Sequence, residues 1–266
     1  MLGSAVEAED IVQDVWVRWQ ATDHSVVLDP PAFLATTATR LAINVAQSAR
    51  TRRETYIGPW LPEPVDTSAD PALGAERGEA LELAVLLMLE KLTPTERAAY
   101  VLREAFDYPY AEIAEVLQLS EANTRQLVAR ARKHIADERR TPVSSEEQRR
   151  LLTAFIAAAQ KGELKALESI LTSDVVSYSD GGGAVRAARV PIVGRPRVAK
   201  FISPVASHFW TGATLAWVEA NGQTSMVMSR DGSIAAIITI AASAEGINQI
   251  QWMMNPAKTA PWHASE

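Results

Sequence analysis

The sequence predicts a protein of several domains, in which two all-α domains, the second a helix-turn-helix, are followed by an α+β domain. Apolar residues recur at helical spacing behind capping signatures over residues 4–138. After residue 143, hairpin-type turn dipeptides separate strand-like runs instead. With 266 residues, 47% of them hydrophobic, the chain can form about one to three ordinary cores, which excludes wholesale disorder.

The first half of the chain predicts helices joined by one linker. A capping box at residues 4–7 begins an amphipathic helix. Asp29, followed by two prolines, begins a second helix that continues into a cluster of arginines. Residues 57–74 have the proline, glycine and acid content of a linker, and residues 75–91 form a third helix. A second capping signature at residues 93–96 begins the helices that follow.

The second half predicts two helices and then a curved antiparallel meander. Ser145 caps a helix over 146–160 that stops at Gly162, and a short helix covers 163–171. A further helix is expected over 196–209. The expected strands are 174–179, 185–193, 213–220, 222–230, 233–243 and 246–254.

Charge is distributed unevenly along the chain. The net charge of −6 argues mildly against nucleic-acid binding, but residues 61–90 alone hold Arg77 against seven acids. Residues 40–53 and 125–133 each carry four basic residues and no acid. Because phosphate contacts depend on charge within about 10 Å, these two stretches are candidate nucleic-acid contacts. The acidic segment between them is a candidate hinge that masks both when DNA is absent.

The composition excludes several classes of protein. The chain has no cysteine, which excludes disulfide scaffolds, thiolate zinc sites and cysteine nucleophiles. Its apolar runs, such as 83–89 and 234–242, are shorter than the roughly 20 residues that span a bilayer. The N-terminus lacks a secretion signal. A cytoplasmic protein without membrane association, metal or cofactor is therefore expected.

Residues 110–128 carry a helix-turn-helix pattern. The first helix is expected over 110–117, Gln118-Leu119 makes the turn, and Ser120 caps the second helix. This leaves Asn123, Arg125, Gln126 and Arg130 on the outward face of the second helix. Such side chains reach base edges in a major groove, and the basic run 130–133 can hold phosphates. The alternative is a solvated basic helix in an ordinary bundle.

Three segments resemble one bacterial family. Residues 8–16 (AEDIVQDVW) are similar to the polymerase-binding helix of extracytoplasmic-function (group 4) RNA polymerase sigma factors. Residues 33–44 resemble their segment that reads and melts the promoter −10 element, and 108–132 resemble their −35-reading domain. The motifs WLPEP at 60–64, DGGG at 180–183 and Asn255-Pro256 resemble a subgroup with a fused SnoaL-like domain of the NTF2 fold.

The resemblance implies a domain order and a function. It implies sigma region 2 at 1–56, N-terminally truncated because the family's first helices would precede Met1. A linker at 57–74, region 4 at 75–142 and an NTF2-like cone at 143–266 follow. The implied function is an alternative sigma factor, not an enzyme, acting in transcription initiation and stress response. Its implied partners are RNA polymerase core and promoter DNA, with no separate anti-sigma factor, because the C-terminal domain modulates activity in cis.

The resemblance also implies roles for individual residues. Polymerase contacts are implied for Asp10, Gln13, Asp14 and Trp16. Contacts with the −10 element are implied for Arg40, Asn44, Arg50, Arg52 and Arg53, with Asn44 binding an extruded base. Contacts with the −35 element are implied for Ser120, Asn123, Arg125, Gln126, Arg130, Arg132 and Lys133. Inter-domain contacts are implied for Trp60, Leu61, Pro62, Glu63, Pro64, Asp180, Gly181, Gly182, Gly183, Asn255 and Pro256.

Two positions depart from the family pattern. Thr124 stands where valine is usual, which directs a hydroxyl towards the core of the helix-turn-helix. Ala184 follows the glycine run where the family usually has lysine, so no role of that lysine transfers to this chain.

The C-terminal domain leaves two other functions open. Its polar and aromatic pocket candidates are Asp174, Tyr178, Asp180, His208, Trp210, Trp217 and Trp252. His208 with an aspartate would be an acid–base pair, although packing or capping is the stronger interpretation of a lone histidine. The alternatives are a one-component helix-turn-helix regulator with an NTF2-like ligand sensor, and an NTF2-like enzyme fused to a DNA-binding domain. Neither explains residues 8–16 or 33–53, which favour the sigma factor.

Overall fold

The computed structural model describes residues 1–67, 83–138 and 140–262. These residues form two compact units. A helical unit contains Met1–Thr55 and Val85–Arg139, and a second unit contains Tyr56–Ala84 and Arg140–Glu266. The predicted linker therefore belongs, as far as it is described, to the same unit as the C-terminal domain.

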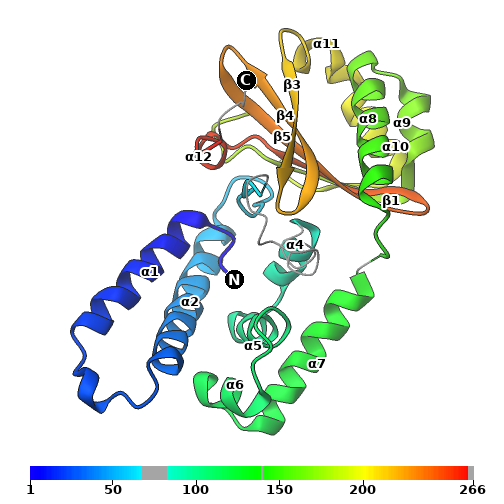
Figure 1. Ribbon diagram of the computed structural model, residues 1–266. Coiled ribbons are helices and arrows are strands. Elements are labelled where there is room, and N and C mark those ends of the chain that lie inside the picture. Colours follow the sequence, from blue (N-terminus) through cyan, green and yellow to red (C-terminus); the bar gives the residue numbers. More distant parts are fainter. Residues whose placement is uncertain (68–82, 139, 263–266) are drawn as a thin grey trace. The chain divides into compact units, whose positions relative to one another are not determined.

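The helical unit contains the elements that the capping signatures predict (Figure 1). Its elements are α1 (Ala5–Gln20), η1 (His24–Val26), α2 (Pro30–Glu54), α4 (Leu83–Lys91), α5 (Pro94–Glu104), α6 (Tyr110–Leu117) and α7 (Glu121–Glu138). The Ser4 side chain accepts a hydrogen bond from the backbone N–H of Glu7 at the start of α1. Thr93 and Glu96 form a reciprocal capping box at the start of α5. The part of the predicted helix 75–91 before residue 83 lies outside the described residues.

Helices α1 and α2 pack on each other through a small core. Ile11 on α1 and Leu41 on α2 are both buried in it. Trp19 stacks on His24, with 4.1 Å between ring centroids, and its ring lies 5.7 Å from that of Phe33. Trp19 thus packs within the hairpin, while Trp16 stays exposed.

Helices α6 and α7 form the predicted helix-turn-helix. Helix α6 ends at Gln118, whose φ of 57° reverses the chain direction. The Ser120 hydroxyl accepts a hydrogen bond from the backbone N–H of Asn123, as expected of an N-cap. Ile113 and Leu127 are buried between the helices. Thr124 is fully buried too, and its hydroxyl donates to the Ser120 carbonyl at 3.1 Å, so the departure from valine leaves no hydroxyl unpaired.

The second unit is a six-stranded sheet with helices beside it. Its helices are α8 (Ser145–Lys161), α9 (Leu164–Ile170), α10 (Arg195–Ile202), η2 (Ser203–Val205), α11 (Ala206–Phe209) and α12 (Pro256–Thr259). Its strands are β1 (Leu171–Asp180), β2 (Ile192–Val193), β3 (Thr214–Ala220), β4 (Gln223–Arg230), β5 (Ser233–Ser243) and β6 (Gly246–Met253). The sheet order is β2-β1-β6-β5-β4-β3. Figure 1 shows α8, α9 and α10 grouped on one side of this sheet, and their apolar residues join the main core.

Three expectations for this unit need correction. The sheet is mixed rather than wholly antiparallel, because β1 runs parallel to β6. Only Ile192–Val193 of the expected strand 185–193 pairs with β1; Val185 and Val190 are exposed, and Pro191 lacks the N–H that a ladder needs. The expected helix 196–209 is broken into α10, η2 and α11 at Ser203, which precedes a proline.

Element boundaries also differ slightly from those predicted. The cap of α8 is Ser144 rather than Ser145. Helix α9 ends at Ile170, so β1 begins at Leu171, earlier than expected. None of the described helices is both long enough and apolar enough to cross a membrane.

Candidate functional site

Helix α1 presents a mixed apolar and acidic surface. The four residues for which polymerase contacts are implied, Asp10, Gln13, Asp14 and Trp16, are all exposed. Trp16 is 60% exposed, and Val12 and Val17 beside it are exposed to a similar degree. Large apolar side chains that gather in solvent on one helix are typical of a protein-binding surface.

Helix α2 carries the candidate −10 contacts. Arg40 and Asn44 are exposed and lie one helical turn apart, so they share a face. The Arg40 Nε donates to the backbone carbonyl of Val116, at 3.2 Å, near the end of α6. Helix α2 thus lies against the helix-turn-helix within the helical unit. Arg50, Arg52 and Arg53 lie on α2, but their side chains are outside the described residues.

The outward face of α7 matches the prediction. Asn123, Arg125, Gln126 and Arg130 are exposed on α7. The Arg125 guanidinium bonds Glu121 at 2.5 Å and lies 5.0 Å from the centroid of the Tyr110 ring. The hydrogen bonds that Arg125 donates to the Glu121 carboxylate raise the pKa of Arg125, so this side chain stays charged. Glu121 and the Tyr110 ring therefore hold the Arg125 guanidinium on the exposed face of α7.

Carboxylates of α5 occupy the neighbouring basic side chains. Arg130 lies 3.4 Å from Glu96, and Arg132 lies 2.7 Å from Glu104. Lys133 is exposed. Surface ion pairs of this kind contribute about 0–1 kcal/mol at most, so phosphates can replace the carboxylates at little cost. The exposed face of α7 is therefore cationic, and carboxylates of α5 hold the Arg130 and Arg132 side chains in place.

The described linker is held by a buried carboxylate of the C-terminal domain. Asp180, at the end of β1, is fully buried. Its carboxylate accepts hydrogen bonds from the Tyr56 hydroxyl at 2.5 Å and the Leu61 backbone N–H at 3.0 Å. It also accepts from the Lys258 ammonium at 2.7 Å and the Gly182 N–H at 3.1 Å. Burial and Asp180 together raise the pKa of Tyr56, which stays protonated.

Lys258 and Asn255 complete this linker site. The Lys258 ammonium donates to the Leu61 carbonyl at 2.5 Å and lies 4.1 Å from the centroid of the Trp60 ring. The Asn255 amide nitrogen donates to the Tyr56 hydroxyl at 2.8 Å. Its amide oxygen caps α12 by accepting from the N–H of Ala257.

The glycine run is required by close approach. A Cβ at residue 181 would lie 2.3 Å from the Val185 carbonyl oxygen. Gly182 has a φ of +60°, and a Cβ there would lie 2.5 Å from the Asn255 side chain. The run thus lets the backbone fold around Asp180, and it is not a phosphate loop.

The end of the WLPEP motif and the residue after it also bind the C-terminal domain. The Pro64 carbonyl accepts from the Trp262 indole at 3.0 Å. The Val65 N–H donates to the Asn221 side chain, and the Asn221 N–H donates back to the Val65 carbonyl. Leu61, Pro62 and Pro64 are buried, Glu63 is half-buried, and Pro256 is exposed.

The structure brings together the predicted residues Trp60, Leu61, Asp180 and Asn255. Tyr56 and Lys258 belong to the same site but were not predicted from the sequence. Lys258 lies three residues after Asn255, and this spacing on one short helix is the only signal that could have indicated it.

Two other sequence expectations fare differently. Of the pocket candidates, Trp210 and Trp252 line a cavity of the C-terminal domain, whereas the others are not among its lining residues. Asp174 is instead paired with Arg140 on the surface, and His208 is exposed, which gives no support to an acid–base pair. Residues 68–82, which are half of the acidic segment 61–90, lie outside the described residues, so the masking role of this segment stays a prediction.

Comparisons with known proteins agree with this geometry. The chain matches the sigma-70 region 2 family over residues 1–53 and the sigma-70 region 4 family over residues 82–135. It is 38% identical to the ECF RNA polymerase sigma factor SigJ of Mycobacterium tuberculosis over 221 residues, which cover 80% of this chain and 69% of that protein. It is 30% identical to the probable ECF sigma factor SigI of the same organism over 268 residues, covering 99% and 90%.

A solved structure extends the likeness to the whole chain. The crystal structure of M. tuberculosis SigJ matches with a TM-score of 0.75 at 32% identity, covering 97% of this chain and 91% of that one. The predicted fold class, helical sigma domains followed by an α+β domain of the NTF2-like type, is confirmed. The chain belongs to the extracytoplasmic-function RNA polymerase sigma factors.

Proposed function

We propose that this alternative sigma factor, which acts in transcription initiation, reads its promoter through two helices whose connecting linker is held by the C-terminal domain. RNA polymerase core and promoter DNA are the partners that its family implies. Helix α2 would contact the −10 element and α7 the −35 element. The observation that carries the proposal is the outward face of α7, where four predicted base-contacting residues are exposed while Leu127 and Val128 on its other side are buried.

The chemistry of each helix suits its proposed target. Arg125 and Gln126 on α7 offer donors and acceptors to base edges, while Lys133 lies further along the helix towards the phosphates. On α2, the exposed Asn44 amide can both donate to and accept from the edge of an extruded base. Trp16 and the acidic residues of α1 would contact the polymerase.

The C-terminal domain would act as a regulator in cis. Tyr56, two residues after the end of α2, and Leu61 of the linker both bind Asp180. A linker fixed at that point has less conformational freedom than a free chain. The C-terminal domain would therefore limit the positions that α7 can take relative to α2. We further propose that this replaces a separate anti-sigma factor, and that the protein works without enzymatic activity in the cytoplasm, where polymerase is found.

In vitro transcription with core polymerase tests the −10 assignment. Asn44→Ala should lose preference for the correct −10 base on a template with a pre-opened bubble, because the base contact follows melting. Gln47→Ala is the matched control, since Gln47 is also exposed on α2. Equal base preference in Asn44→Ala and the wild type would contradict the assignment.

A pull-down with core polymerase separates the proposal from a one-component regulator. A sigma factor should bind core polymerase in the absence of DNA, and Trp16→Ala should weaken that binding. A simple repressor should instead bind duplex operator DNA without polymerase.

A further inference from the structure

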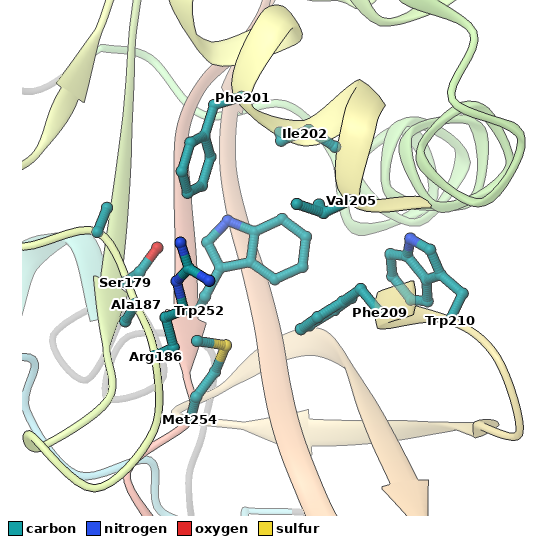
Figure 2. Close-up of a pocket in the computed structure, with 11 residues that line it drawn as sticks. Ser179, Arg186, Ala187, Phe201, Ile202, Val205, Phe209, Trp210, Trp252 and Met254 are labelled. Carbon is teal, nitrogen blue, oxygen red and sulfur yellow. The ribbon is translucent and has the colours of Figure 1, made fainter. Parts of the chain in front are cut away.

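The C-terminal domain contains a cavity with aromatic walls. It has a volume of about 100 Å³ and opens beside α10 and η2. Its lining residues are Ser179, Arg186, Ala187, Ala188, Phe201, Ile202, Val205, Phe209, Trp210, Trp252 and Met254. Figure 2 shows Arg186, Phe201 and Met254 to one side of the Trp252 indole, with Phe209 and Trp210 to the other. The walls are thus almost entirely apolar, with one cationic side chain among them.

The aromatic side chains of the cavity are held in fixed positions. The Trp252 indole N–H donates to the buried Ser177 hydroxyl at 3.1 Å. The Phe209 ring lies edge-on to that of Trp252, with centroids 5.5 Å apart. Phe201 and Val205, in contrast, are each 41% exposed, although both are large apolar side chains. Exposed apolar side chains at the opening of a cavity with buried aromatic walls are unfavourable in water and favour the binding of an apolar group.

The polar groups of the wall indicate what the cavity accepts. Arg186 is exposed, and within the described part of the chain no carboxylate pairs with it. Other exposed arginines, such as Arg125 and Arg150, do pair with carboxylates. The buried Trp210 indole N–H also finds no acceptor among the described residues. The wall therefore contains two hydrogen-bond donors, the Arg186 guanidinium and the Trp210 indole N–H, that no acceptor of the described residues satisfies.

We propose that this cavity binds a small aromatic carboxylic acid. The ring would lie against Trp252 and Phe209, where edge-to-face contacts are favourable. The carboxylate would pair with Arg186, whose planar guanidinium matches it with two parallel hydrogen bonds. The cavity volume of about 100 Å³ is smaller than the about 150 Å³ of a cavity that holds benzene, so it favours one small ring over a fused multi-ring body, with the carboxylate at the open side beside Arg186. The cavity wall adjoins the linker site, because Ala188 lies beside Gly58 and the Met254 N–H donates to the Asp180 carbonyl, but the inference does not depend on the role of the linker.

Calorimetric titration of the full chain with 3-phenylpropanoate tests the proposal. The wild type should bind this acid more tightly than its neutral methyl ester. Arg186→Met should weaken binding of the acid by roughly tenfold while leaving binding of the ester unchanged. Arg189→Met, which changes an exposed arginine of the same segment outside the cavity lining, should match the wild type.

A second pair of variants tests the apolar wall. Phe201→Ala should weaken binding of both compounds, because it removes an exposed side of the mouth. Phe106→Ala removes a 65% exposed phenylalanine from the helical unit and should have no effect. Circular dichroism confirms that each variant is folded. No binding by the wild type at millimolar acid, or binding unaffected by both Arg186→Met and Phe201→Ala, would overturn the proposal.

Discussion

The Lys258 ammonium lies 2.7 Å from the Asp180 carboxylate, and only 7% and 0% of the two side chains remain exposed. Withdrawing both charges from water is costly, and their mutual attraction offsets this only when the remaining donors and acceptors are paired. Two of those remaining partners are the Tyr56 hydroxyl, directly before the linker, and the Leu61 N–H within it. The ion pair and the bound linker are therefore one interdependent structure.

Asp180→Asn should destabilise the C-terminal unit by about 3–5 kcal/mol, because it leaves the Lys258 charge buried without its partner. Chemical denaturation, followed by tryptophan fluorescence, measures the loss. The double variant with Lys258→Met should recover part of it, since neither charge then remains. Asp174→Asn is the control, because the Asp174–Arg140 pair is partly exposed and should contribute less than about 1 kcal/mol. Similar losses for Asp180→Asn and Asp174→Asn would contradict the argument.

Tyr56 should make the linker site sensitive to alkaline pH. Burial and the nearby Asp180 charge raise the pKa of Tyr56 above its usual value of 10.0. The folded state therefore holds this proton more tightly than the unfolded state does. The resulting stabilisation is fully present below about pH 10 and is lost as the pH rises further. The denaturant midpoint should fall more between pH 8 and pH 10.5 for the wild type than for Tyr56→Phe. Equal falls in the two proteins would contradict this prediction.

The helix-turn-helix could be predicted because its signals are local. The turn at Gln118-Leu119 and the Ser120 cap follow each other directly in the sequence, and both agree with the structure. The linker site was only half predictable. Its motifs indicate Trp60 and Asp180, but Tyr56 meets Asp180 across 124 residues of sequence, and no local pattern records such a pairing.

The errors in the C-terminal domain have the same origin. The parallel pairing of β1 with β6 joins segments that are distant in sequence, so strand patterns alone suggested a simple meander. The cavity wall includes Arg186 and Phe201, which come from a loop and a short helix. Sequence reasoning chose polar residues such as Asp174 because it could not tell which side chains face inward.

Arg125→Ala should abolish discrimination at the −35 element. The variant removes a guanidinium that Glu121 and the Tyr110 ring hold on the exposed face of α7. Holoenzyme binding to promoters with the correct and a changed −35 sequence should differ by roughly tenfold for the wild type and little for the variant. Arg150→Ala is the control, because Arg150 is an exposed arginine that is likewise paired with a glutamate, Glu147, but lies in the C-terminal unit. A wild type that does not distinguish the two sequences would refute base recognition by this helix.

Lys133→Ala should weaken binding to every promoter alike. A lysine that neutralises one phosphate releases its counterions, so its removal should reduce the slope of log K against log salt by about one. Holoenzyme–promoter titrations between low and moderate salt measure this slope. Lys161→Ala changes an exposed lysine of the C-terminal unit and should leave the slope unchanged. An unaltered slope in Lys133→Ala would contradict a phosphate contact.

The hydrogen bond between Arg40 and the Val116 carbonyl, 3.2 Å long, should break when the protein engages a promoter. The −10 and −35 elements are about 25 base pairs apart, or roughly 85 Å along straight DNA. Arg40 cannot remain beside α6 while it contacts one element and α7 occupies the other.

Because the chain has no cysteine, spin labels at Gln47→Cys and Glu115→Cys report the separation of α2 and α6 without interference. That distance should increase by at least about 20 Å with core polymerase and promoter DNA. A label pair at Glu115→Cys and Ala129→Cys, inside the helix-turn-helix, should keep its distance. An unchanged α2–α6 distance would show that the two helices do not contact the two elements together.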